Sequence, residues 1–284
     1  MLLATRRDQP PATDQPTETM LEFDASELAD LHNHLVPAVD DGARSIQEAV
    51  HHLCALARDG VRRLAVSPHL DARLVHQPGA LGERLERLEA GFHELVTACA
   101  GRTDVPRLQF GQEILAPDPS TAEAAFAVAS LGIGGTRYAL IEFGFDLGDD
   151  PPGVVRAVRA AGRHPIVAHP ERYRRNGGPV DITEIRAWKE AGALLQLNGG
   201  SLLGGYGEAI EELAWGLLRE GLIDLISTDH HADARPVSPA QVGRRLVARG
   251  AAEQARLLLS ENPLRILNDQ DTVPVPCWTV PVAA

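Results

Sequence analysis

Asp30-Leu31-His32-Asn33-His34 ends the first apolar run of the chain. Alternate residues of a strand point to the same side, so the imidazoles of His32 and His34 can reach one metal ion. Near the other end of the chain, Ser227-Thr228-Asp229-His230-His231 repeats this spacing with Asp229 and His231. Two such pairs, each at the end of an apolar run, indicate a hydrolytic metal site rather than an isolated structural ion.

Between these two stretches, short apolar runs alternate with amphipathic segments. Seven runs are expected to form strands, at residues 28–34, 61–67, 107–112, 138–143, 165–169, 193–198 and 222–227. The segments between and after them have helical periodicity, at residues 46–59, 81–100, 153–161, 182–191, 207–220, 239–248 and 251–259. This alternation predicts a parallel α/β barrel rather than an antiparallel sheet.

In such barrels the carboxyl ends of the strands surround the active site. Side chains that can bind metal follow nearly every predicted strand: His32, His34, Asp41, His69, Glu113, Glu142, His169, Asp229 and His231. Asp40 is an alternative to Asp41, and the other aspartate of this pair would cap the turn before Gly42. So many polar groups at one rim are costly unless they bind something. Imidazole and carboxylate without thiolate favour Mn, Zn or Fe in a hydrolytic cluster.

Composition excludes several classes of protein. The formal net charge of -12 argues against nucleic acid as the main partner. The three cysteines form no C-x-x-C pair, which suits a reducing cytoplasm, and none has an arginine six positions later, as a cysteine-dependent phosphatase requires. The chain contains no apolar run of roughly 18 residues, so no membrane span is expected.

At these residues the sequence resembles the polymerase and histidinol phosphatase (PHP) superfamily, and within it the bacterial tyrosine-protein phosphatases of capsule and exopolysaccharide loci. The resemblance runs from about Ala29 to about Leu267 and rests on residues 30–34, 39–42, 67–69, 111–113, 137–143, 166–173, 227–231 and 261–263. It implies a distorted (β/α)7 TIM-like barrel, the PHP fold, over residues 29–270. An N-terminal extension, 1–28, is expected to be disordered, and residues 271–284 to form a C-terminal tail.

The resemblance also implies a site for three divalent metal ions, Mn²⁺ in the first place, with Fe or Zn as alternatives. The first ion would take His32, His34, Glu113 and Asp229, the second Glu113, Glu142 and His169, and the third Asp41, His69 and His231. Arg172 and Arg235 match positions that the family gives to arginines near the phosphate, and a guanidinium can hold phosphate oxygens in a fork. Hydrolysis without a covalent phosphoenzyme is implied.

The implied activity is that of a protein-tyrosine phosphatase in the cytoplasm. Its substrate would be the phosphotyrosine tail of a bacterial tyrosine kinase that controls polysaccharide export. One alternative is a PHP phosphatase for a small phosphate monoester such as histidinol phosphate. Another is a non-catalytic or nuclease PHP module, which the complete ligand set, the acidic charge and the sparse aromatic residues disfavour. A homo-oligomer remains open.

Other polar residues have structural interpretations. His51, His52 and His93 are expected on helices at or near the surface, and His230 points away from its neighbours if the strand continues. Arg172 has Glu171 as an alternative partner. After His69, where the family often has further basic residues, this chain has Leu70-Asp71-Ala72-Arg73, and Arg73 is the one candidate there for an extra phosphate contact.

Overall fold

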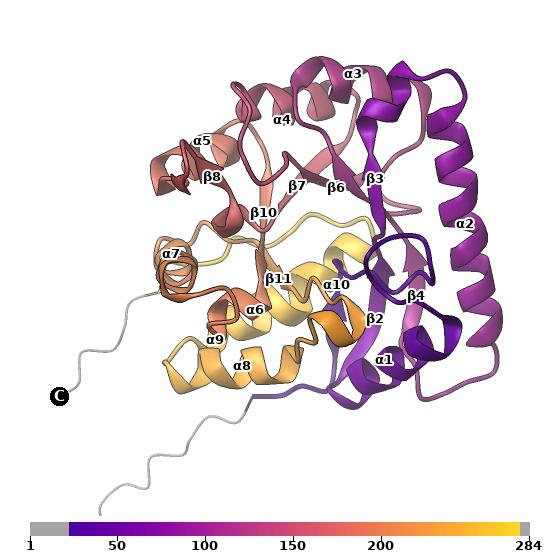
Figure 1. Cartoon of the computed structure of the whole chain (residues 1–284). Helices are drawn as coiled ribbons and strands as arrows, with labels where there is room; N and C mark the ends of the chain where they lie inside the picture. The colour runs from indigo at the N-terminus through magenta and orange to yellow at the C-terminus, as the bar shows by residue number, and fades with distance from the viewer. Residues whose placement is uncertain (1–22, 279–284) are drawn as a thin grey trace, which may run out of the picture.

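The structure, a computed structural model, describes residues 23–278. The disorder predicted for residues 1–22, and the last residues of the predicted tail, 279–284, lie outside this range. Strands and helices alternate along the described chain, as predicted, and the helices surround the strands (Figure 1).

Two parallel sheets form the centre of the molecule. The smaller consists of β1 (Leu28–Asp30), β2 (Val61–Val66) and β4 (Arg107–Phe110). The larger has, in spatial order, β11 (Leu225–Ser227), β10 (Leu194–Asn198), β7 (His164–Ala168), β6 (Tyr138–Glu142), β5 (Glu113–Leu115) and β3 (His69–Asp71). An antiparallel hairpin, β8 (Arg174–Arg175) with β9 (Gly178–Pro179), lies apart from both sheets.

Two of the predicted strands are interrupted and then resume. Ser67 and Pro68 separate β2 from β3, and Gly111 and Gln112 separate β4 from β5. Pro68 has no N–H to donate, which interrupts the ladder of β2. His69 and Glu113 were expected to follow the ends of strands, but they are the first residues of β3 and β5 and lie opposite each other in register.

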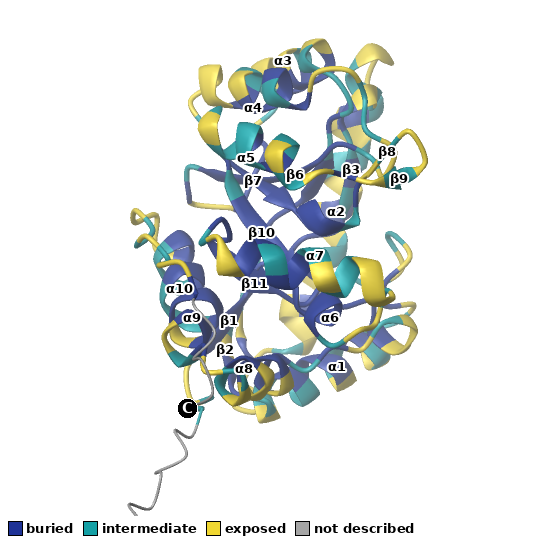
Figure 2. Cartoon of the chain, turned by 90° about the vertical axis from the view of Figure 1, so that its left-hand side faces the viewer, coloured by how far each residue is buried: buried dark blue, intermediate teal, exposed yellow. Residues whose placement is uncertain are grey.

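The described helices are α1 (Ile46–Arg58), α2 (Ala80–Ala98), α3 (Pro119–Val128), α4 (Pro151–Ala160), α5 (Ile182–Glu190), α6 (Gly199–Leu202), α7 (Glu208–Arg219), α8 (Pro239–Ala248), α9 (Ala252–Arg256) and α10 (Asn262–Leu267). Their exposed faces point outward, while most central strands are buried and the β8–β9 hairpin is partly exposed (Figure 2). Among the described helices, none is long and apolar enough to cross a membrane.

Local sequence signals explain most helix boundaries. Ser45 caps α1 by accepting a hydrogen bond from the N–H of Glu48 at 3.2 Å. The carboxylate of Glu48 accepts from the N–H of Arg44 instead of that of Ser45, so the reciprocal bond of a capping box is missing. Gly60 follows α1 with φ 99°, and a Cβ there would lie 1.6 Å from the carbonyl oxygen of Ala25. Only glycine fits this turn.

No helix or strand was predicted for residues 119–128, which form α3. Asp118 caps this helix and Pro119 is its first residue, a combination typical of a helix start. The helix predicted at residues 251–259 extends further in the structure, because a π-helical segment, Leu257–Glu261, joins α9 to α10.

Both described ends of the chain pack against the core. Phe23 and Ala25, in the predicted extension, contact the main hydrophobic cluster. In the predicted tail, the ring of Trp278 is 5.5 Å from that of Trp215 on α7. Asn262 also exchanges two hydrogen bonds with the backbone of Val273. These contacts lie away from the polar strand ends.

Candidate metal centre

The two stretches with alternate metal-binding residues lie side by side. The N–H of Asp229 donates to the carbonyl of His32 and the N–H of His34 donates to that of His230, each at 2.8 Å. Asn33 and His230 form a parallel bridge. Although β1 ends at Asp30, earlier than predicted, this pairing directs His32 and His34 toward Asp229.

Five side-chain atoms form the first group. The Nε2 atoms of His32 and His34 are 3.3 Å apart and lie 3.4 and 3.5 Å from Oδ1 of Asp229. The carboxylate of Glu113 approaches both imidazoles, with Oε1 3.2 Å from His32 and Oε2 3.4 Å from His34. His32, His34 and Glu113 are buried, so this group is enclosed by protein.

Glu113 also faces a second group. Its Oε1 lies 2.9 Å from Nε2 of His169, and its Oε2 lies 2.9 Å from Nδ1 of His69. The same His69 nitrogen is 3.7 Å from Oε1 of Glu142. Glu113 is therefore placed between two groups of donor atoms.

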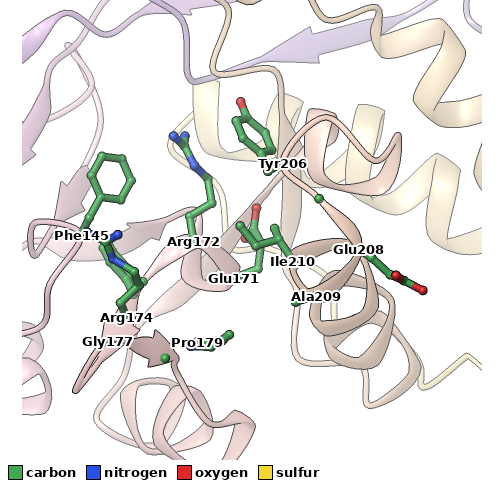
Figure 3. A pocket seen from close by; sticks show the side chains of 13 residues that line it. Phe145, Glu171, Arg172, Arg174, Gly177, Pro179, Tyr206, Glu208, Ala209 and Ile210 are labelled. Atoms are coloured by element: carbon green, nitrogen blue, oxygen red, sulfur yellow. The ribbon is translucent and has the colours of Figure 1, made fainter.

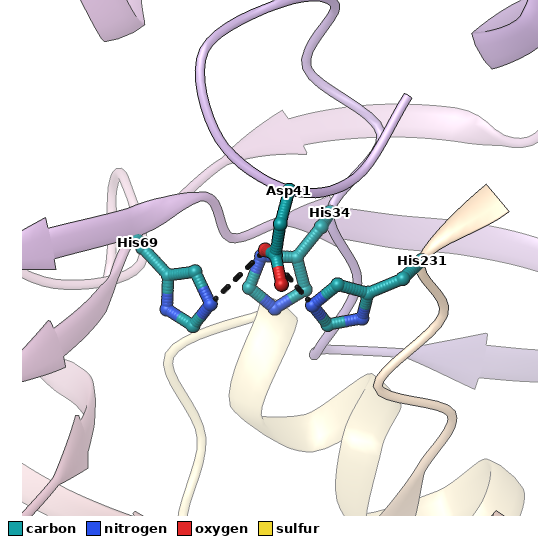
Figure 4. A group of neighbouring side chains, drawn as sticks. All are labelled: His34, Asp41, His69 and His231. Atoms are coloured by element: carbon teal, nitrogen blue, oxygen red, sulfur yellow. Dashed lines mark ion pairs between the residues drawn. The ribbon is translucent and has the colours of Figure 1, made fainter. Parts of the chain in front are cut away.

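The third group lies nearer the surface, under the loop after β1 (Figure 4). Oδ1 of Asp41 is 3.4 Å from Nε2 of His69 and 3.2 Å from Nε2 of His231. The ring of His34 stacks on that of His231 with centroids 3.8 Å apart. The nine residues singled out in the sequence thus lie in one continuous cluster, in which His34 and His69 each border two groups.

Neighbouring side chains orient the imidazoles. Nδ1 of His32 lies 2.8 Å from Oε1 of Gln196, and Nδ1 of His34 lies 2.9 Å from Oδ2 of Asp40. Asp40 also accepts from the N–H groups of Gly42 and His69. Asp40 is therefore the turn cap and Asp41 faces the cluster. Such contacts on the remote nitrogen direct Nε2 inward. The sequence analysis did not identify Gln196, because an isolated glutamine in a strand carries no signal.

The electrostatics of the cluster fit bound cations. Burial alone would lower the pKa of His69, but hydrogen bonds with Asp41 and Glu113 raise it to about 10. Burial, together with the charge of Glu113, raises the pKa of Glu142 to about 7. His69 and Glu142 thus both keep a proton to a higher pH than usual, because each lies among carboxylates. Within residues 23–278, Nε2 of His231 and Oε2 of Glu113 are buried without a well-aligned hydrogen bond, as expected for atoms that bind metal.

Arg172 and Arg235 converge on the same oxygen. Their Nη1 atoms lie 2.5 and 3.1 Å from Oδ2 of Asp229, which also accepts from Nδ2 of Asn198 at 2.9 Å. Arg172 does not pair with Glu171, whose Oε1 accepts from Ser201 and from the N–H of Asn198. Both arginines therefore lie at the edge of the candidate metal cluster.

Arg73 behaves differently from these two arginines. Its guanidinium pairs with the carboxylate of its neighbour Asp71, at 2.7 Å, and its side chain is exposed. The described contacts do not bring it to the cluster.

The prediction that His52 lies at or near the surface was wrong. His52 is buried, with Nε2 3.1 Å from Oδ1 of Asp233 and Nδ1 3.0 Å from Nε2 of His230. Nδ1 of His230 accepts from the N–H of Val237, which means that His230 donates to His52 and His52 donates to Asp233. His230 points away from the cluster, as predicted, and His51 and His93 are exposed. The burial of His52 could not be predicted from the sequence of α1, because the loop of residues 230–237, distant in the chain, covers that face of the helix.

Comparisons with known proteins identify the family of this chain. Residues 28–268 match the family described as capsular polysaccharide synthesis, CpsB/CapC. Tyrosine-protein phosphatase YwqE of Bacillus subtilis is 26% identical over 247 residues, covering 86% of this chain and 92% of that protein. Tyrosine-protein phosphatase CpsB of Streptococcus pneumoniae is 24% identical over 253 residues, covering 86% of this chain and 99% of that protein.

A solved structure from a study of these two proteins, described there as unique metal-dependent tyrosine phosphatases, superposes with a TM-score of 0.67. It is 26% identical and covers 89% of this chain and 100% of that one. Since the family match spans nearly all the described residues, the chain belongs to the CpsB/CapC family of capsular polysaccharide synthesis proteins.

Proposed function

We propose that this protein is a metal-dependent protein-tyrosine phosphatase. Its substrate would be a phosphotyrosine of a bacterial tyrosine kinase in capsule or exopolysaccharide biosynthesis, and this would place the enzyme in the cytoplasm. The observation that carries the proposal is the convergence of nine histidine, aspartate and glutamate side chains beside two arginines. The relatives YwqE and CpsB are tyrosine-protein phosphatases, which supports the substrate class.

We also infer that the two sheets belong to one distorted seven-stranded barrel, with residues 29–270 as the catalytic domain. The chain passes directly from the smaller sheet to the larger one twice, where β2 leads into β3 and where β4 leads into β5, which supports this inference. The bridge between Asn33 and His230 joins the two remaining edges. Counting each interrupted pair once, the ring would consist of β1, β2–β3, β4–β5, β6, β7, β10 and β11.

We infer three divalent ions, Mn²⁺ in the first place and Fe or Zn as alternatives, because oxygen and imidazole ligands without thiolate suit these metals. His32, His34, Glu113 and Asp229 would hold the first. Glu113, Glu142 and His169 would hold the second, and Asp41, His69 and His231 the third. When bound, such ions activate water and neutralise phosphate oxygens.

The chain's own residues would bind and orient the phosphate. Arg172 and Arg235 together point N–H groups at one position, which Oδ2 of Asp229 now occupies. A phosphate near the cluster would attract both guanidinium groups, and two charge-assisted contacts would fix its orientation. Asn198 would keep Asp229 in place while the arginines move, because its amide donates to Asp229 independently of them.

The test is a metal-supplemented assay that compares a phosphotyrosyl peptide, histidinol phosphate and single-stranded DNA. We expect turnover of the peptide and far less of the other two. Turnover of histidinol phosphate well above that of the peptide would refute tyrosine-phosphatase activity and favour the small-monoester alternative.

A substitution tests the metal centre separately. His32→Ala should abolish activity and reduce the metal content of the purified protein, measured by elemental analysis. The exposed His93 provides the control, since His93→Ala should change neither quantity. Wild-type metal content in His32→Ala would contradict the proposed centre whatever its activity.

A further inference from the structure

A cavity of about 540 Å³ has Arg172, which contacts Asp229 of the metal centre, among its lining residues (Figure 3). It lies between the β8–β9 hairpin and the beginning of α7. Much of its wall is apolar or aromatic, with contributions from Phe145, Tyr173, Pro179, Tyr206 and Ile210. Its volume is in the range of cavities that enclose a ligand of several hundred daltons, far more than a phosphate group fills.

Arg172 connects this cavity to the metal centre. Its side chain lines the cavity, and its guanidinium contacts Asp229. The guanidinium carbon lies 4.9 Å from the ring centroid of Phe145 and 4.4 Å from that of Tyr206. A phosphate bound by Arg172 would therefore have the rest of its molecule next to the cavity.

Phe145 adds an apolar surface at the edge of the cavity. Its side chain is 43% exposed, which is unusual for a large hydrophobic residue in the described chain. Its ring also stacks on that of His169, with centroids 5.8 Å apart. When the phosphate is bound at the metal centre, an aromatic group attached to it would extend toward the cavity and contact the ring of Phe145.

The cavity also presents polar groups that suit a peptide backbone. Glu171 is fully buried in its wall, and within the described residues its Oε2 accepts no hydrogen bond. Helix α7 starts at the same cavity, and its N-cap, Gly207, supplies no side-chain acceptor. The first N–H groups of a helix have no intrahelical partner. The N–H groups at the start of α7 are donors that a backbone C=O of a bound peptide can use, and Oε2 of Glu171, unpaired among the described residues, is buried in the wall behind the lining surface.

We propose that this cavity binds the polypeptide that flanks the phosphotyrosine of the substrate. The proposal rests on the proposed phosphatase function and assigns the recognition of the peptide to these residues. The phosphate is held at the arginines, the tyrosyl ring passes Phe145, and neighbouring residues of the peptide occupy the cavity. A small phosphate monoester reaches the metals without using it.

The test introduces bulk into the cavity. Ala209 lines it but is exposed, so Ala209→Trp should fold normally. Glu212→Trp, on the same helix but outside the cavity, is the matched control. Steady-state kinetics are measured with a phosphotyrosyl peptide and with p-nitrophenyl phosphate, a small aryl phosphate.

For Ala209→Trp we expect the KM of the peptide to rise about tenfold, with kcat unchanged and with normal constants for p-nitrophenyl phosphate. An unchanged peptide KM, or an equal loss on both substrates, would overturn the proposal. Ile210→Ala, which enlarges the cavity instead, is a second test variant. A peptide KM for Ile210→Ala equal to that of the wild type would also count against the proposal.

These outcomes differ from a failure of the proposed function. If the wild-type enzyme hydrolyses p-nitrophenyl phosphate but not the phosphotyrosyl peptide, the proposed protein-tyrosine phosphatase activity fails and this inference fails with it. If the wild-type enzyme hydrolyses both and the variants match it, only the assignment of the cavity is wrong.

Discussion

Asp30 accepts two hydrogen bonds from Thr228, one from its N–H at 3.0 Å and one from its hydroxyl at 2.7 Å. The two residues are 198 positions apart in the chain, and both are buried. Burial raises the pKa of Asp30, while the bonds from Thr228 act in the opposite direction. This contact joins the first strand to the segment that carries Asp229, so it aligns the two halves of the first metal-binding group.

Removing this carboxylate should destabilise the protein. Asp30→Ala leaves the buried N–H of Thr228 without its acceptor, and the Thr228 hydroxyl keeps only its longer bond, to the carbonyl of His32 at 3.3 Å. We expect a loss of about 2–3 kcal/mol in the free energy of unfolding. Urea denaturation measures it. Thr228→Val removes one of the two bonds and should cost about 1 kcal/mol. Equal stability of Asp30→Ala and wild type would show that the contact does not hold the strands together.

Replacing Arg172 by lysine should impair phosphate binding without unfolding the protein. Lysine retains the charge but loses the planar fork and the stacking between Phe145 and Tyr206. We expect kcat/KM for a phosphotyrosyl peptide to fall about 10- to 100-fold, the effect of losing a hydrogen bond to a charged group. The control is Arg186→Lys, at an exposed ion pair with Glu220. Similar kinetics for both variants would remove Arg172 from the phosphate site.

The chain from His230 through His52 to Asp233 should support activity from outside the cluster. His52→Ala breaks both contacts and loosens the loop that carries His231 and Arg235. Loss of such supporting contacts usually lowers metal affinity or activity about 10- to 100-fold. Metal titration measures the affinity, and steady-state kinetics measure kcat. The adjacent His51 is exposed, so normal affinity is expected for His51→Ala, and an equal result for His52→Ala would show that the contacts are incidental.

Metal removal should lower thermal stability. Without cations, Glu113, Glu142 and Asp229 leave negative charge crowded in a buried site. A ligand at a hundred times its Kd stabilises the native state by about 2.7 kcal/mol. We therefore expect a chelator to lower Tm and added Mn²⁺ to restore it, measured by thermal unfolding. His32→Ala should respond much less, and an equal Tm response in that variant would place the stabilising ion elsewhere.

Much of the fold could be predicted because its signals are local. The apolar runs located β6, β7 and β10 to within one or two residues. Ser45 and Asp181, residue types typical of N-caps, precede α1 and α5, whose predicted starts agree with the structure. The missed helix, α3, is short and rich in alanine, so its periodicity is weak. The interruptions at Pro68 and Gly111 were overlooked because an apolar run does not show where hydrogen bonding changes partner.

By itself, the sequence determined which chemical groups are available and, except for His69 and Glu113, which strands they follow. His32, His34, Asp229 and His231 could be singled out because alternation along a strand is a property of a few consecutive residues. Other features depended on tertiary structure: Asp41 rather than Asp40 faces the cluster, both arginines meet Asp229, His52 is buried, and a cavity adjoins Arg172. These depend on contacts between distant segments, which form only when the strands assemble, and no local pattern encodes them.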